Sequence, residues 1–245
     1  MKAMNKAVLL IVEGPCEEVL LIDRLRELFE NHKIRFYIQG GDMFSDFRNR
    51  QRSIKAIVGE TVKKYMNKYK FKPEDILAVL QIIDTDGCFI PEGNIKIDVN
   101  QGTKTLYCQD NICVIDEEQK RRIIERNEQK SRNVKIMKTS SKILENKIDY
   151  RIYYFSRNLE HALFNEPNPN EETKISDVER FLDDLEVPVE DFLREYIPSS
   201  SSDDYGVKYL ESWQQVEQGL ASLHRYTNVP LLFEFIQLSS STIES

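Results

Sequence analysis

The chain has 245 residues, of which 40% are hydrophobic and 31% charged, and its formal net charge is −7 at pH 7. These values predict a globular protein with one core, or one core with a smaller appended unit, and argue against binding of polyanions over the whole surface. No apolar stretch approaches the roughly 18 to 20 residues of a membrane helix and we find no signal peptide, so we expect a cytoplasmic protein without a membrane partner.

The first third of the chain alternates apolar runs with helical patterns. Residues 7–12 and 76–83 are apolar without alternation, as in strands buried on both faces of a parallel sheet, and residues 34–38 form a shorter strand. Helical spacing covers residues 17–29. A second helix is expected after the turn at residues 39–42, and it ends at about residue 68. This order predicts an α/β fold whose sheet is mostly parallel and has helices on both faces.

The pattern changes after Gly87. Short β-prone pieces at 95–99, 105–108 and 112–115 predict a small antiparallel insertion, within about 92–147. A charged helix is expected from 117 to about 130, and the basic stretch up to 147 has few core residues, so we expect it on the surface or over the site. A strand at 150–155 and a short helix through Phe164 complete a domain at 1–165.

The remainder, 171–245, is predicted to be an acidic helical region. Helices are expected around 176–196 and 209–225, with Trp213, Tyr209 and Phe233 forming a small core and a frayed end after Leu238. The cysteines show no paired metal-binding or disulfide spacing, so we interpret them as reduced thiols. They are Cys16, Cys88, Cys108 and Cys113.

Charge is distributed unevenly along the chain. Residues 119–151 contain eleven Lys or Arg and four Asp or Glu, whereas residues 160–204 contain fourteen acidic and three basic residues. One face could therefore meet a phosphate backbone while another docks a basic partner, although solvated helix faces explain the pattern equally well. The candidate nucleic-acid contacts are Arg48, Arg50, Arg52, Arg121, Arg122 and, for a phosphate, Arg157.

Carboxylates follow two of the buried strands. Glu13 comes directly after residues 7–12, and Asp84 and Asp86 come directly after residues 76–83. Ligands of open α/β sheets bind beyond the carboxyl ends of the strands, so these side chains are expected at one site. Carboxylate oxygens suit Mg²⁺ or Mn²⁺, and in phosphodiester cleavage such ions activate water and neutralise phosphate charge.

These motifs resemble the TOPRIM domain, a metal-binding module of topoisomerases, primases and several nucleases. The resemblance rests on residues 12–18 (Val-Glu-Gly-Pro-Cys-Glu-Glu) and 84–87 (Asp-Thr-Asp-Gly), and it covers about 6–165. Residues 156–160 (Ser-Arg-Asn-Leu-Glu) stand where stand-alone, overcoming-lysogenization-type and RloB-like proteins carry a last acidic motif. Cys16 replaces the threonine often found in the first motif, which would weaken a helix cap there.

The resemblance implies roles for individual residues. Glu13 would be the first metal ligand or the general base, Asp84 and Asp86 the central metal pair, and Glu17 and Glu160 ligands of a second metal. The implied catalytic residues are Glu13, Asp84 and Asp86.

The expected function is therefore a Mg²⁺- or Mn²⁺-dependent nuclease acting on DNA or RNA in prokaryotic anti-phage defence. The chain has no P-loop motif, so a controlling ATPase would be a separate protein, and self-association into a homo-oligomer is left open. The alternative is a non-catalytic regulatory module that holds a metal or nucleotide and recruits a partner. A topoisomerase or primase fragment is disfavoured, because 245 residues leave little room for the further domains.

Simpler interpretations exist for each motif. Residues 13–15 can be a strand-to-helix turn followed by acids that complement a helix N-terminus, and residues 84–87 can be an Asx turn. The Ser156 to Glu160 spacing resembles a displaced capping box. His161 can be structural or can serve as a proton shuttle.

Overall fold

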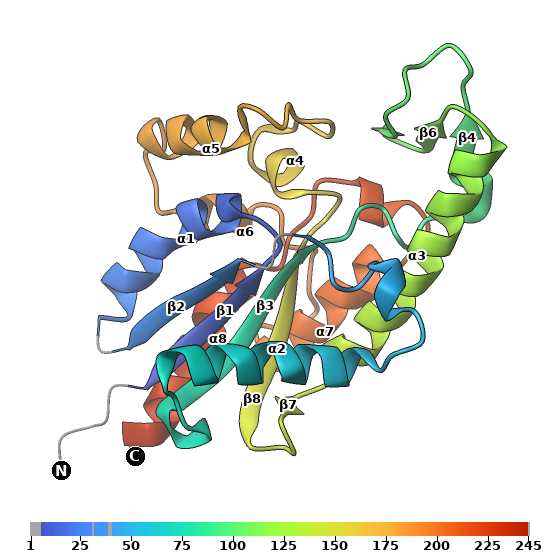
Figure 1. Ribbon diagram of the computed structural model, residues 1–245. Coiled ribbons are helices and arrows are strands. Elements are labelled where there is room, and N and C mark those ends of the chain that lie inside the picture. Colours follow the sequence, from blue (N-terminus) through green and yellow to red (C-terminus); the bar gives the residue numbers. More distant parts are fainter. Residues whose placement is uncertain (1–5, 31, 39–40, 245) are drawn as a thin grey trace.

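A five-stranded sheet forms the centre of the protein in a computed structural model that describes residues 6–30, 32–38 and 41–244 (Figure 1). The strand order is β2-β1-β3-β8-β7, in which the first four strands are parallel and β7 is antiparallel to β8. The strands are β1 (Ala7–Val12), β2 (Lys33–Ile38), β3 (Ile76–Asp84), β7 (Lys142–Ile143) and β8 (Ile148–Phe155). The predicted α/β class with a mostly parallel sheet is confirmed.

Burial explains the two apolar runs. Every residue of β1 and the first eight residues of β3 are buried, because helices cover both faces of the sheet. The one polar side chain within the buried part of β3, Gln81, accepts a hydrogen bond of 2.7 Å from the Tyr150 hydroxyl on β8. Burial of that amide is therefore compensated.

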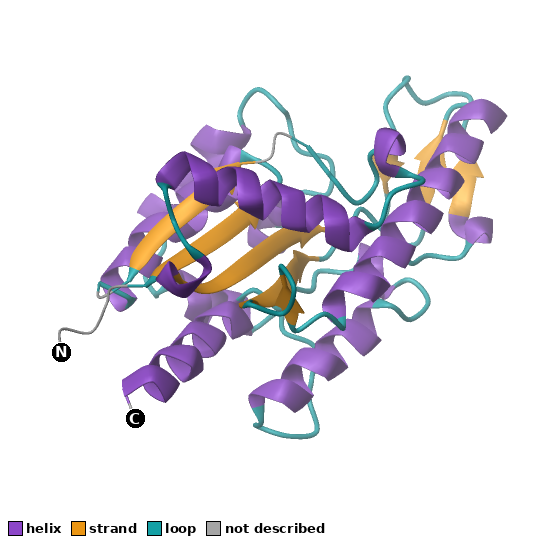
Figure 2. Cartoon of the chain, turned by 60° about the horizontal axis from the view of Figure 1, so that its bottom comes forward, coloured by secondary structure: helices purple, strands orange, loops and turns teal. Residues whose placement is uncertain are grey.

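Helices lie on both sides of the sheet, as predicted (Figures 1 and 2). In Figure 1, α2 (Ile54–Tyr69) crosses in front of the strands and α8 (Pro230–Glu244) lies behind them. The helix α1 (Pro15–Leu28) contacts α6 (Val189–Arg194) and α5 (Lys174–Asp183). The short α4 (Leu159–Phe164) follows β8 and also contacts α5.

A second, smaller sheet lies at one end of the long helix α3 (Glu117–Lys138). Its order is β4-β6-β5, with bounds β4 (Ile95–Ile97), β5 (Leu106–Tyr107) and β6 (Ile112–Val114). The predicted antiparallel pairing is right for β5 and β6 but wrong for β4, which pairs with β6 in parallel. The chain between β4 and β6 is long enough to return to the end of the sheet at which β4 begins, as parallel pairing requires.

The helix α3 extends eight residues beyond the predicted end at 130. Its buried residues recur every three or four positions, so one face of the helix packs against β8 and the loops that follow β2 and β3. The residues with this spacing are Ile123, Asn127, Lys130, Val134 and Met137, and Gln129 and Asn133 are buried beside them. The basic stretch that was expected on the surface or over the site thus contributes Val134 and Met137 to the main hydrophobic core.

The C-terminal helices share the main hydrophobic core. Trp213, on α7 (Tyr205–Val216), lies 4.7 Å from Tyr154 of β8 between ring centroids, and Phe233 of α8 belongs to the same cluster. The expected separate small core is therefore not found, and the helix α8 continues past Leu238 to Glu244 instead of fraying. The division of the chain at residues 165–171 stays a prediction.

Two further expectations concern the cysteines and the turn after β2. All four cysteines are free thiols. Residues 39 and 40 of the predicted turn lie outside the described part of the chain, whereas Gly41 and Asp42 lie within it. Among the helices that are described, none combines the length and apolar character needed to cross a membrane.

Candidate active site

The carboxyl ends of three neighbouring strands bring acidic side chains together. Glu13 follows β1, Asp84 ends β3, and Asp86 lies two residues later, as the sequence predicted. The structure adds Asp42, which follows β2. Because the three strands are parallel and adjacent, their carboxyl ends meet at one edge of the sheet.

The ammonium group of Lys130 lies among these acids. Its Nζ is 2.7 Å from Asp42 Oδ2, 2.5 Å from Asp86 Oδ2 and 3.8 Å from Glu13 Oε1. The lysine side chain has no exposed surface, whereas Glu13 and Asp42 retain 15% and 13% exposure. Burial would lower the pKa of Lys130, but the three carboxylates outweigh it and hold that pKa above its ordinary value.

The net pKa shifts of the three acids differ in direction, although burial raises the pKa of each. Desolvation raises the pKa of Glu13 and of Asp84 well above the ordinary values for these side chains. Asp86 is also desolvated, but Lys130 and Arg126 more than compensate and lower its pKa. The cluster thus combines a carboxylate fixed as an anion with two that resist ionisation.

A second acidic pair adjoins Asp84. Glu17 on α1 and Glu160 on α4 are each 3% exposed, and both raise the pKa of Asp84. Burial, followed by repulsion from Glu160, raises the pKa of Glu17 to about 7. Lys174 Nζ lies 3.8 Å from Glu160 Oε1 and supplies the nearest positive charge. Asp84 therefore links two acidic groups, each with its own lysine.

The turn after β3 is fixed by the neighbouring loop after β8. Thr85 is fully buried, and its Oγ1 accepts a hydrogen bond of 2.8 Å from the backbone N–H of Arg157. The N–H of Asp86 in turn donates to the Arg157 carbonyl at 2.9 Å. Asp86 and Gly87 both have left-handed φ angles of 50° and 63°, a conformation that Asp tolerates and Gly favours.

Helix α1 begins beside the site with Gly14 as its N-cap residue. The N–H of Gly14 donates to Glu17 Oε2 at 3.3 Å, so Glu17 satisfies the helix N-terminus as the simpler interpretation proposed. Cys16 lies inside the first turn and is buried, which raises the pKa of its thiol to about 12. The idea that a threonine there would cap the helix is therefore wrong.

Helix α4 is capped by Asn158. Its side chain accepts a hydrogen bond of 2.8 Å from the N–H of His161, whereas Ser156 Oγ donates to the Ala221 carbonyl at 3.1 Å. The displaced capping box is thus not formed, and Glu160 is left to face Glu17 and Asp84. Burial lowers the pKa of His161 to about 4, so its ring is neutral near pH 7.

The buried oxygens in the cluster are suited to a hard cation. Glu13 Oε1 and Asp84 Oδ1 accept no hydrogen bond, although buried polar atoms normally do. Both belong to carboxylates, whose oxygens Mg²⁺ and Mn²⁺ prefer. As the described side chains stand, no three His, Cys, Asp or Glu are already spaced to hold a metal, and Lys130 occupies the space between Asp42 and Asp86.

Most of the predicted nucleic-acid contacts are exposed. Arg121 is exposed, and four other arginines form ion pairs with neighbouring acids. The pairs are Arg48–Asp46, Arg50–Glu125, Arg52–Glu60 and Arg122–Glu118. Arg157 differs, because it is 2% exposed and its guanidinium donates to the carbonyls of Cys108 and Leu223. In this conformation it supports the loops and does not face solvent.

Sequence reasoning missed Asp42, Lys130 and Lys174 as members of the site. Asp42 was detectable, because it follows a strand that neighbours β1, and Lys130 was detectable as a charge on the buried face of α3. Arg126 donates to the Asp86 carbonyl at 2.8 Å, and no pattern in the sequence specifies that contact.

No protein-family model matches this chain, and no curated protein or solved structure gives a match either.

We predict that Lys130→Met destabilises the protein by about 3–5 kcal/mol in EDTA, because it leaves buried carboxylates without their counter-charge. Added Mn²⁺ should restore more stability to this variant than to the wild type, since the ion can replace the ammonium. Thermal unfolding with and without Mn²⁺ measures both effects. Lys135→Met, on the exposed face of α3, is the control. Equal effects of the two substitutions would contradict the ion-pair cluster.

A second prediction concerns pH. The raised pKa of Glu17 means that the folded state binds its proton more tightly than the unfolded state, so this residue costs stability as pH rises from about 4.5 to about 7. Glu17→Gln should therefore be more stable than wild type at pH 8 in EDTA, by roughly 3 kcal/mol at most, and equal to it near pH 4. Denaturant unfolding across this range tests the prediction, and a pH-independent difference would refute it.

Proposed function

We propose that this protein is a divalent-metal-dependent nuclease with a TOPRIM-type active site that cleaves phosphodiester bonds in DNA or RNA. The observation that carries the proposal is the convergence of Glu13, Asp42, Asp84 and Asp86 from three adjacent parallel strands. Two of these acids hold buried oxygens that accept no hydrogen bond. The parallel strands explain why their ends share one edge, but turns without a common role would not require an acid at each of the three ends.

The chain order of the motifs supports the TOPRIM assignment. A glutamate follows the first strand and an Asp-x-Asp pair follows the third, and β1 and β3 are neighbours in the sheet. Glu160 lies after β8, the next strand beyond β3, so all of the motifs that carry the resemblance lie at the same edge. This agreement is an analogy of arrangement, and function is argued from the side chains.

The residues divide naturally into two sets. Glu13, Asp42, Asp84 and Asp86 would hold one Mg²⁺ or Mn²⁺ ion, and Asp84 with Glu17 and Glu160 would hold a second. Such ions lower the pKa of bound water and neutralise charge on the scissile phosphate.

Two side chains of the cluster would have roles besides metal binding. Lys130 keeps Asp86 anionic, whereas burial raises the pKa of Glu13, so that this carboxylate would accept a proton more readily than an exposed glutamate does.

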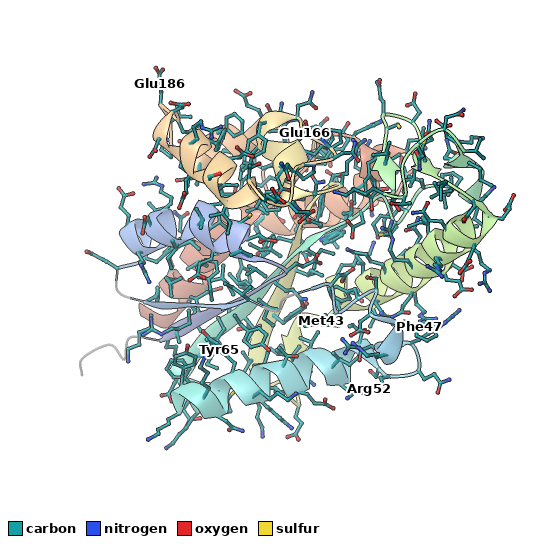
Figure 3. All side chains as sticks on the ribbon, turned by 45° about the horizontal axis from the view of Figure 1, so that its top comes forward. Met43, Phe47, Arg52, Tyr65, Glu166 and Glu186 are labelled. Atoms are coloured by element: carbon teal, nitrogen blue, oxygen red, sulfur yellow. The ribbon has the colours of Figure 1, made fainter. Side chains whose placement is uncertain are left out.

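The proposed partners follow from charge and from the resemblance. The helix α5, which belongs to the acidic region 160–204, lies on α1 and α4 beside the site (Figure 1). This region offers a surface for a basic partner, which we propose to be a separate ATPase. Glu166 and Glu186, labelled in Figure 3, belong to the same acidic region. Anti-phage defence in the cytoplasm, and a homo-oligomeric state, are proposed by family analogy alone.

A second candidate is a regulatory module that binds a metal or nucleotide without cleavage. Lys130 favours it, because the ammonium already neutralises Asp42 and Asp86 and an ion must compete with it. The two candidates differ in whether any substrate is cut.

The test is cleavage of plasmid DNA, a single-stranded oligonucleotide and tRNA in Mg²⁺, Mn²⁺ or EDTA. We expect metal-dependent cleavage that falls by at least about 100-fold in Asp84→Asn/Asp86→Asn, since even supporting residues of metal sites contribute 10- to 100-fold. The control is Asp110→Asn, an exposed acid of the small sheet.

Cleavage that survives in the double variant would refute the site. Mn²⁺ binding without cleavage of any substrate would favour the regulatory module.

A further inference from the structure

The segment between β2 and α2 begins in the acidic cluster and carries an exposed aromatic side chain. Phe47 is 71% exposed, and among the large hydrophobic residues that the structure describes only Val99, at 72%, is comparable. The segment begins at Asp42 in the cluster and reaches α2 after Arg52 (Figure 3). A single exposed phenylalanine is not unusual in itself, so its meaning depends on the groups around it.

The backbone that leads to Phe47 is not loose, because hydrogen bonds from α3 hold the segment that carries Phe47. Phe44 is fully buried, and its carbonyl accepts a hydrogen bond of 2.7 Å from Asn133 of α3. The Asp46 carbonyl accepts another, of 2.8 Å, from Gln129 of the same helix. Gln129 is the neighbour of Lys130 in sequence, so one turn of α3 positions both the acidic cluster and the backbone that presents Phe47.

Three arginines follow Phe47 in the sequence, and one of them lies over its ring. The side chains of Arg48, Arg50 and Arg52 are 88%, 43% and 46% exposed, and the Arg50 guanidinium lies 5.8 Å from the Phe47 ring centroid. The acids that pair with Arg50 and Arg52 are 39% and 51% exposed, so these two pairs contribute little and a phosphate can take the place of the carboxylate. The Arg48 side chain holds Asp46 through three hydrogen bonds, so a phosphate must compete with that carboxylate. In a chain of net charge −7, three arginines within five residues are a local exception.

A hollow lies between this segment and α2. It has a volume of about 310 Å³ and is lined by Asp42, Asp46, Arg48 and Thr61, among others. Asp42 is the one acid of the cluster that lines it, so a nucleic-acid strand in the hollow would lie between Arg48 and Asp42.

We propose that residues 42–52 form a platform for single-stranded nucleic acid, on which one unpaired base stacks on Phe47 while the adjacent phosphates contact Arg48 and Arg50. Only an unpaired, unstacked base can offer its face to an aromatic ring, and such stacking tolerates any base. A base inside a continuous duplex has no free face. The platform thus selects single strands without reading their sequence, and it gives the proposed nuclease its substrate class.

The proposal rests on the proposed function for its purpose, but binding can be measured without cleavage. The experiment follows fluorescence anisotropy of labelled dT20 and rU20, and of a 20-base-pair duplex, in EDTA and low salt. Wild type should bind the single strands more tightly than the duplex. Phe47→Ala should weaken single-strand binding by about 5- to 150-fold, the contribution of one stacked base, and Phe47→Trp should retain it.

Two controls separate stacking from general charge or surface effects. Val99→Ala removes an equally exposed side chain from the small sheet and should leave binding unchanged. Arg48→Gln should weaken the binding of all three nucleic acids alike and should reduce the salt dependence of binding by about one phosphate contact. Arg194→Gln, in a similar exposed ion pair on α6, should change neither.

Unchanged binding in Phe47→Ala, or equal wild-type affinity for the duplex and the single strands, would overturn the platform. These results are distinguishable from failure of the nuclease proposal. Binding through Phe47 without cleavage would support the platform and contradict the nuclease. Metal-dependent cleavage with unchanged binding in Phe47→Ala would support the nuclease and contradict the platform.

Discussion

The contact between Lys130 and the carboxylates of Asp42 and Asp86 is the interaction on which the rest of the site depends. Three parallel strands end at one edge and each delivers an acid there, which without a positive charge would be repulsive in a buried place. The ammonium comes from the middle of α3 and is itself fully buried, so its desolvation is offset mainly by these two short ion pairs, with Glu13 at a longer distance. The same turn of α3 holds the segment that carries Phe47, through Gln129. One helix therefore sets the geometry of both the acidic cluster and the surface beside it.

The cluster nevertheless has more acids than one ammonium can neutralise. Burial raises the pKa of Glu13 and Asp84, whereas that of Asp86 is lowered, because it has Lys130 and Arg126 beside it. The fold thus tolerates the excess acids by favouring their protonated forms. A divalent cation would resolve the same conflict with the acids ionised, so under the proposed function stability, proton binding and metal binding would be coupled at this edge of the sheet. Such coupling would distinguish a metal site from a set of unrelated strand-end turns.

The sequence predicted the strand-end acids well and the groups around them poorly. Glu13 and Asp84 were found because uninterrupted apolar runs mark buried parallel strands, whose carboxyl ends must share an edge. Asp42 was missed because its position depends on the pairing of a short edge strand. Lys130 was missed because its helix is highly charged, which concealed the regular spacing of its buried face. Arg157 lies in a predicted motif, but it turns inward toward backbone carbonyls, and the direction of a long side chain is set by tertiary contacts that no local pattern records.

The central claim is that this acidic cluster is a divalent-cation site in which Lys130 stands in for the ion. Anomalous X-ray scattering from crystals of the protein soaked in Mn²⁺ tests it most directly, because it locates the ion and the lysine in one measurement. The account predicts a manganese peak bonded to oxygens of Asp84 and Asp86, with Lys130 Nζ moved away from its 2.5 Å contact with Asp86. A map with no manganese at the cluster and the Lys130 ion pairs intact would contradict it.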